Sequence, residues 1–191
     1  KIIERVLRIR NYKATAPGLD GIQATLLQHA SLALPLARLY QSLFNASVVP
    51  KEWKLAMVTP IFKTGKSSDA SNYRPISLTS LCCEIMESVI KDDISAHSLS
   101  KGLISRHQHG FLSRRSTGTQ LIDCFNDWTL NIENKQSLDV IYIDFAKAFD
   151  SVVHRKLISK LTSYGIRGSL LSWIENFLTD RFQCVCTMVF I

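Results

Sequence analysis

The chain has 191 residues, 46% of them hydrophobic and 20% charged, a composition that excludes a disordered protein and indicates a globular one. Lysine and arginine exceed aspartate and glutamate by 23 to 16, and the net charge of +7 suits a polyanionic partner such as nucleic acid. No apolar run approaches the roughly 18 residues of a membrane helix, and nothing like a signal peptide opens the sequence, so no membrane partner is expected.

The first third of the chain predicts two helices. Residues 16–21 have the composition of a turn, and Asp20 is a suitable N-cap for a helix over residues 22–29. A second helix is expected over residues 36–46, directly after Pro35.

A β-hairpin is predicted next. Residues 55–62 read as a strand, residues 63–74 as a polar and basic loop, and residues 76–80 as a second strand with alternating apolar side chains. The hairpin would therefore carry a long, positively charged tip.

Helical periodicity dominates the middle of the chain. An apolar stripe predicts a helix over residues 81–98, and a segment rich in glycine and arginine, residues 109–115, interrupts the pattern. A further helix follows, with one apolar face formed by Leu121, Ile122, Phe125, Trp128 and Ile132.

The last third predicts a strand and two helices. A β-branched and aromatic run suggests a strand over residues 140–144, and Asp150 is a candidate cap for a helix that ends at Gly165. The apolar stripes of the two helices are Val153, Leu157, Leu161 and Tyr164 for the first, and Leu170, Leu171, Ile174, Phe177 and Leu178 for the second. All of these stripes are expected to form core.

The five cysteines are odd in number and form no recognisable disulfide framework, so reduced thiols in an intracellular protein are expected. Cys184 lies close to Cys186 and His107 close to His109, but neither pair has the spaced partner pair that a zinc site needs. No zinc site is predicted.

The most informative segment runs from Val140 to Val153. Asp144 ends the predicted strand, a position where α/β proteins often place catalytic groups, and its carboxylate could bind a hard cation such as Mg²⁺. An ordinary acid at a strand end, followed by a capping Asp150, is the alternative interpretation.

The amino-acid sequence of this segment resembles the first catalytic motif of reverse transcriptases, particularly those of non-LTR (LINE-type) retrotransposons. Further blocks resemble the same family in the same order, and together they cover nearly the whole chain. They are residues 13–22, an upstream extension; 63–78, the fingers motif; 108–117, the next motif; 142–152, the first catalytic motif; and 165–181, the following palm helix.

The resemblance implies a role for each matched residue near the catalytic centre. Asp144 would be a catalytic metal ligand, and the backbone carbonyl of Phe145 would also contact a metal. Phe149 would lie under the incoming sugar and exclude a 2′-hydroxyl. The nucleotide triphosphate would be held by Arg74 and by either Lys63 or Lys66.

The block 108–117 would contact the template. The residues at matched positions are Gln108, Arg115, Ser116 and Thr117, whereas Leu112 and Arg114 depart from the basic and small residues usual in the family.

The implied fold is α+β, like the fingers and palm of a right-hand polymerase. It is helix-rich, with a basic β-hairpin and an incomplete palm sheet. The fingers and the start of the palm would occupy residues 1–136, a partial palm residues 137–181, and a divergent tail residues 182–191. In the intact protein the cofactor would be Mg²⁺ and the partners an RNA template, a DNA primer and dNTPs, in the nucleus or in a cytoplasmic ribonucleoprotein.

The sequence lacks two features of the family. No Asp-Asp pair follows Asp150, and no Pro-Gln-Gly block occurs anywhere. One carboxylate cannot hold the two cations of the polymerase reaction, so the chain alone is expected to be inactive. Three alternatives remain: a nucleic-acid-binding remnant or domesticated host protein, a maturase-type reverse transcriptase of a mobile intron, and an unfolded pseudogene product whose palm sheet lacks strands.

Overall fold

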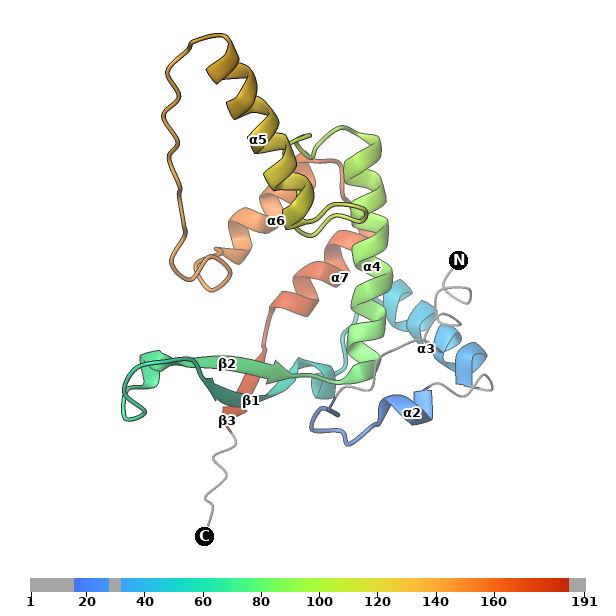
Figure 1. The fold of residues 1–191 in the computed structure, drawn as a ribbon. Helices are drawn as coiled ribbons and strands as arrows, with labels where there is room; N and C mark the ends of the chain where they lie inside the picture. Colours follow the sequence, from blue (N-terminus) through green and yellow to red (C-terminus); the bar gives the residue numbers. More distant parts are fainter. Residues whose placement is uncertain (1–15, 28–31, 186–191) are drawn as a thin grey trace. The chain divides into compact units, whose positions relative to one another are not determined.

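A computed structural model describes residues 16–27 and 32–185, which form a mixed α and β structure (Figure 1). The chain divides into two compact units. Unit 1 contains the described residues up to Ser95 and those from His154 on, and unit 2 is Ala96–Val153. None of the helices in the described ranges is both long enough and apolar enough to cross a bilayer.

Unit 1 begins with a turn and two helices. Asp20 does not cap a helix as predicted, because its carboxylate accepts the N–H of Ile22 at 3.2 Å within the turn, and helix α2 (Ala24–Leu27) begins later. The predicted helix also covered residues 28 and 29, which lie outside the described ranges. Helix α3 (Ala33–Asn45) is confirmed and includes Pro35 in its first turn, where a missing N–H costs nothing.

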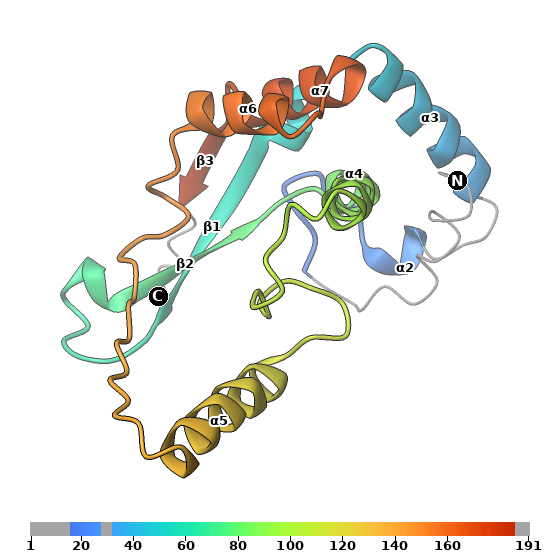
Figure 2. The same cartoon turned by 90° about the horizontal axis from the view of Figure 1, so that it is seen from above.

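The predicted hairpin is confirmed. A short 3₁₀ helix, η3 (Lys51–Lys54), leads into β1 (Leu55–Phe62), which pairs antiparallel with β2 (Tyr73–Leu78) after the loop and a second 3₁₀ turn, η4 (Ala70–Asn72). Strand β3 (Phe182–Val185) was not predicted, and it lies parallel to β1, so the sheet order is β2-β1-β3 (Figure 2).

Three helices complete unit 1: α4 (Leu81–Ser100, which continues into unit 2), α6 (His154–Ser163) and α7 (Gly168–Leu178). Helix α4 supplies the largest share of the buried core, whereas no residue of α6 is buried. After α6, Gly165 adopts a φ of 85°, which confirms the predicted helix stop. The largest fully buried side chains, contributed by α3, α4 and α7, are Trp173, Tyr40, Leu81, Met86 and Cys83.

Glycine is required at position 18 by a close approach to backbone. A Cβ there would lie 2.5 Å from Thr79 O and 2.8 Å from Ser80 N, at the junction between β2 and α4. Backbone atoms cannot give way as a flexible side chain can. We therefore expect Gly18→Ala to lower the free energy of unfolding by about 2–3 kcal/mol, measured by urea denaturation.

The matched control for this substitution is Gly118→Ala. Gly118 is helical, and its nearest foreign atom would be Ser116 Oγ at 3.5 Å, an ordinary contact. Alanine there should raise stability by about 0.5–1 kcal/mol. Equal effects of the two substitutions would contradict the close approach at Gly18.

A partly buried carboxyl on α4 makes the stability of unit 1 depend on pH. Burial raises the pKa of Glu87, while its hydrogen bond from Cys83 and the nearby Arg181 lower it. The Cys83 Sγ donates to Glu87 Oε1 at 3.2 Å, and burial also raises the pKa of this thiol, which keeps it protonated. The folded state thus binds the proton of Glu87 more tightly than the unfolded state, whose ordinary value is 4.5.

The stability that this proton contributes is fully present below the ordinary pKa and is lost as the pH rises through the raised one. Glu87→Gln keeps a hydrogen-bond acceptor for Cys83. It also removes the loss of stability with rising pH, because glutamine does not ionise. We expect the variant to be more stable than the parent at neutral pH, by a margin that widens as the pH rises from about 4 to 8 in urea unfolding. The exposed Glu133→Gln is the control, and a less stable Glu87→Gln protein at neutral pH would contradict the prediction.

Unit 2 contains helix α5 (Thr117–Glu133) and long irregular segments. The helix is confirmed, but the prediction that its stripe forms core is wrong: no residue of α5 is buried, and Phe125 is 57% exposed. The predicted strand 140–144 is also wrong, since those residues pair with no strand in the described part of the chain. Asp150 lies in a turn over residues 146–151 and does not cap α6, which begins four residues later at His154.

Candidate nucleotide and template site

The tip of the hairpin is folded by its own polar groups. The N–H of Lys63 donates to Asn72 O at 2.8 Å, and Asn72 Nδ2 donates to Lys66 O at 2.9 Å. Tyr73 Oη donates to Ser67 O at 2.9 Å. Gly65 has a φ of 96°, and a Cβ there would meet Asn72 Nδ2 at 2.7 Å, so the loop depends on a glycine at this position.

The three predicted triphosphate ligands all lie on this hairpin in unit 1, and all are exposed. Arg74 lies in β2 opposite Ile61 of β1, whereas Lys63 and Lys66 lie in the loop. Within the described ranges, the side-chain cations of these residues have no ion pair or hydrogen bond. Their charges are therefore available to an anionic ligand. The structure does not favour either lysine over the other.

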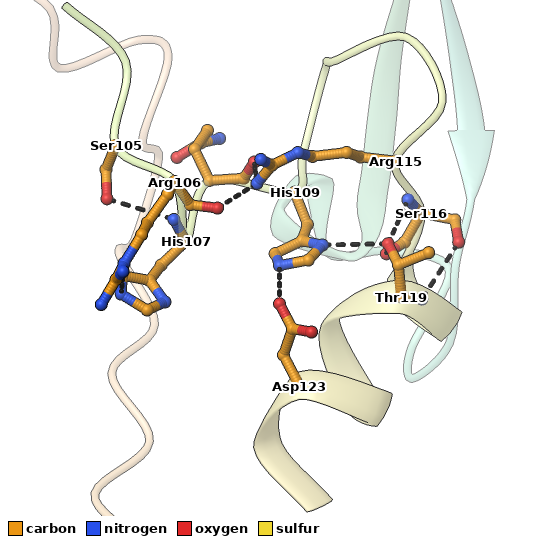
Figure 3. A network of polar contacts seen from close by, with 9 residues as sticks. Ser105, Arg106, His107, His109, Arg115, Ser116, Thr119 and Asp123 are labelled. Carbon is orange, nitrogen blue, oxygen red and sulfur yellow. Dashed lines mark hydrogen bonds and ion pairs between the residues drawn. The ribbon is translucent and has the colours of Figure 1, made fainter. Parts of the chain in front are cut away.

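The predicted template block, residues 108–117, is held together by Arg115 in unit 2 (Figure 3). Arg115 Nη1 donates to Gln108 O at 2.8 Å and also to Arg106 O. The side-chain amide of Gln108 donates to Gly110 O at 3.0 Å. A guanidinium has five N–H donors, so these two bonds to carbonyl oxygens leave Arg115 with donors for a phosphate.

His109 is the buried centre of this block. Its side chain is 7% exposed, with Nδ1 2.9 Å from Thr119 Oγ1 and Nε2 3.1 Å from Asp123 Oδ2 (Figure 3). Because a carboxylate only accepts, Nε2 donates to it, and the ring ties the loop to α5 at two points. Sequence reasoning treated His109 only as half of a rejected zinc pair. The spacing of Thr119 and Asp123, four residues apart on one helical face, was the signal that could have revealed it.

Ser116 caps α5. Its Oγ accepts the N–H of Thr119 at 3.2 Å, and Thr119 Oγ1 accepts the N–H of Ser116 at 2.9 Å, a reciprocal capping box. Thr117 is exposed at the first helical position. A template contact by either residue remains a prediction.

We expect Ser116→Ala to lower the free energy of unfolding of the region by about 1 kcal/mol, measured by urea denaturation, because α5 loses its cap. Thr117→Ala is the control and should have little effect on stability. Ser116→Asp should restore the cap while placing a negative charge in the template block. An Ala variant as stable as the parent would show that the cap contributes nothing.

The first catalytic motif lies in the irregular part of unit 2. Asp144 and Phe145 are exposed, and the described residues provide no partner for the Asp144 carboxylate. Phe149 is 77% exposed, and its ring lies edge-to-face with that of Phe111 at 6.1 Å. The structure thus brings the predicted sugar-contacting ring beside the template block.

The described residues include no cluster of three or more His, Cys, Asp or Glu side chains that could hold a metal ion. Asp144 offers one carboxylate, and a two-cation site needs several. The residues in the described ranges therefore do not form a complete magnesium site.

The family model for reverse transcriptase (RNA-dependent DNA polymerase) matches residues 61–189. The chain belongs to the reverse transcriptase family. The matched span contains the hairpin loop, the template block and the first catalytic motif, and it runs past Arg181 through most of the segment predicted to be a divergent tail. It is a reverse transcriptase domain of the type found in LINE-type elements.

Similar proteins come from insect transposable elements. The domain is 32% identical over 175 residues to the probable RNA-directed DNA polymerase from transposon BS of Drosophila melanogaster, and 34% identical over 170 residues to the RNA-directed DNA polymerase from mobile element jockey of the same species. Each match covers 87% of the domain and 18% of the relative. The Pol polyprotein from type-1 retrotransposable element R2 of Popillia japonica is 25% identical over 178 residues, 90% of the domain and 23% of that protein. The chain thus spans about a fifth of the length of these relatives.

Proposed function

We propose that this chain is the fingers and part of the palm of an RNA-directed DNA polymerase of a non-LTR retrotransposon. The observation that carries the proposal is the ordered set of family motifs inside the matched span 61–189. The fingers and the start of the palm would occupy residues 1–136, and the partial palm with the first catalytic motif residues 137–181. The intact protein would act in the nucleus or in a cytoplasmic ribonucleoprotein.

In the intact enzyme the reaction would be Mg²⁺-dependent, RNA-templated addition of dNTPs to a DNA primer. Asp144 and the carbonyl of Phe145 would contribute ligands to the metal site, which supplies charge neutralisation at the transferring phosphate. Arg74 would bind the triphosphate bidentately, supported by Lys63 or Lys66. Support for these nucleotide contacts comes from three exposed cations on one hairpin, none of them engaged by the described residues.

Template contacts would come from Gln108, Arg115, Ser116 and Thr117. Phe149 would lie nearby, under the incoming sugar, and exclude a 2′-hydroxyl. The edge-to-face contact of Phe149 with Phe111 supports this arrangement, because Phe111 belongs to the block 108–117 and both rings lie in unit 2.

A primer-extension assay tests the proposal with two polypeptides. The 191-residue chain alone should give no template-dependent product, because it supplies one carboxylate of the metal site. A chimera, in which residues 16–185 replace the matching segment of the jockey polymerase, should extend a primer on an RNA template. An inactive chimera beside an active parent enzyme would refute the proposed function, and product from the chain alone would refute the inactivity.

A further inference from the structure

A cavity at the base of the sheet has the features of a nucleic-acid contact. It encloses about 410 Å³, is lined by Lys51, Lys54, Leu55, Asp180 and Phe182, and lies entirely in unit 1. None of these residues belongs to the nucleotide or template positions described above. The cavity exists only because β3 pairs with β1, which sets Phe182 beside Leu55.

Lys54 is the most unusual of the lining residues. It is only 8% exposed, and no ion pair or hydrogen bond to its ammonium occurs within the described part of the chain. The ammonium is not among the buried side-chain atoms without a partner, so the buried part of Lys54 is its aliphatic stem and its charge remains accessible. The exposed Lys51, three residues earlier in η3, adds a second positive charge at the same cavity. Together they exceed the single negative charge of Asp180, so the cavity favours an anion.

Phe182 supplies an aromatic surface beside these cations. It is 67% exposed, and burial within its own unit does not explain why an aromatic ring stands there. Exposed aromatic rings beside lysines are the usual means of binding single-stranded nucleic acid, with bases stacking on the ring and phosphates on the cations. The Asp180 carboxylate could accept hydrogen bonds from base N–H or ribose hydroxyl groups.

The pleat of β1 connects this cavity with Arg74. Side chains at positions 55, 57, 59 and 61 point to one face of the strand, and Arg74 is paired with Ile61 while Phe182 is paired with Leu55. Arg74 and Phe182 therefore lie on the same face. The opposite face carries the hollow lined by Val58, Tyr73 and Val185, among others. Between positions 55 and 61, β1 is roughly 20 Å long, the span of a short nucleic-acid strand.

We propose that the cavity of Lys51, Lys54 and Phe182 binds one nucleotide unit of a single-stranded nucleic acid that continues along the face of the sheet carrying Arg74. A phosphate contacts the two ammonium groups, and the base stacks on Phe182. This site extends the proposed polymerase function and rests on it only for the direction of the strand toward Arg74.

The test measures fluorescence anisotropy of labelled RNA and DNA oligonucleotides of about 12 nucleotides with the 191-residue chain at several salt concentrations. Lys54→Met should weaken binding about fivefold and reduce the salt slope by about 0.7, the value for one lost phosphate contact on a single strand. Phe182→Leu should weaken binding about fivefold with the salt slope unchanged, because stacking releases no counterions. This difference in slope is one that a merely structural role would not produce.

Conservative variants and matched controls complete the design. Lys54→Arg and Phe182→Tyr should restore binding. Lys156→Met, an exposed lysine of α6, and Phe62→Leu, on the other face of β1, should bind like the parent. Lys51→Gln changes an exposed residue, so it tests the charge without disturbing the fold if Lys54→Met proves unstable by circular dichroism.

The outcomes separate this site from the proposed function. One outcome is that Arg74→Gln weakens oligonucleotide binding while Lys51→Gln and Phe182→Leu bind like the parent. This outcome would overturn the proposed site and leave the polymerase assignment intact. Failure of the parent chain to bind either oligonucleotide would also overturn the site, while the chimera assay would still judge the polymerase. If free mononucleotide, at the same concentration as the oligonucleotide, abolished oligonucleotide binding, the cavity would be a pocket for a single nucleotide. That result would overturn the proposed contact with a strand. RNA and DNA arms of equal affinity support a contact to phosphate and base, and stronger RNA binding adds a sugar contact by Asp180.

Discussion

Replacing Asp144 by asparagine in the jockey chimera should lower primer extension by at least about 10²–10³-fold, because a metal ligand at the transferring phosphate is lost. Asparagine has nearly the same shape as aspartate but no negative charge, so it should leave the local backbone unchanged. The exposed carboxylate of Asp144 has no partner among the described residues whose loss could alter the fold. Initial rates over a range of Mg²⁺ concentrations would measure the effect.

Two other acids near Asp144 make matched controls. Asp150 belongs to the same motif but lies in the turn over residues 146–151, and Asp139 precedes the motif in the same exposed segment. Asp150→Asn and Asp139→Asn chimeras should extend primers at close to the parental rate. Activity of the Asp144→Asn chimera comparable to theirs would remove Asp144 from the metal site, whatever the family resemblance implies.

The elements that the sequence predicted well are those held together by local interactions. The hairpin formed by β1 and β2 follows from alternation on both sides of a polar loop, and α3, α4, α5 and α7 follow from apolar periodicity. Such patterns record which face of an element is apolar. They do not record what will cover that face, which is why the stripe of α5 predicted a core while Phe125 and Ile122 are exposed.

The failures concern pairing between distant segments. Strand β3 has only four residues, and its parallel partner β1 begins 127 positions earlier in the chain. No local sequence pattern therefore predicts the pairing of β3 with β1. The run 140–144 has strong strand composition, but a strand also needs a neighbour for its backbone hydrogen bonds, and the described residues provide none. Propensity describes the composition of the segment and could not supply its partner.

The candidate site divides in the same way. The sequence motifs singled out Arg74, Lys63, Lys66 and Asp144 as candidates, but the mutual geometry of these residues depends on tertiary structure that no motif contains. The roles of His109 and Lys54 were missed because each depends on burial, which a single residue type does not reveal. The position of His109 is explained by its contacts with Thr119 and Asp123. The position of Lys54 is explained by the cavity that β3 completes.

The core of unit 1 should be most sensitive at Trp173. This side chain is 1% exposed and stacks on Phe177, with ring centroids 5.3 Å apart and an interplanar angle of 13°. Trp173→Ala should lower the free energy of unfolding by about 3–5 kcal/mol, since it leaves a large cavity among α3, α4 and α7. Trp128→Ala is the control, because Trp128 is only half-buried on α5 and its removal should cost about 1 kcal/mol.

Trp173→Phe separates the cavity from the polar group. The indole Nε1 of Trp173 is buried and has no hydrogen-bond partner among the described residues. A buried donor without a partner is destabilising, so phenylalanine removes an unfavourable group while retaining most of the stacking on Phe177. The Phe variant should therefore lose much less stability than the Ala variant, by about 2 kcal/mol or more in urea denaturation followed by circular dichroism. Equal losses would mean that the indole N–H does find a partner in solution and that this bond, not packing alone, holds α7 in the core.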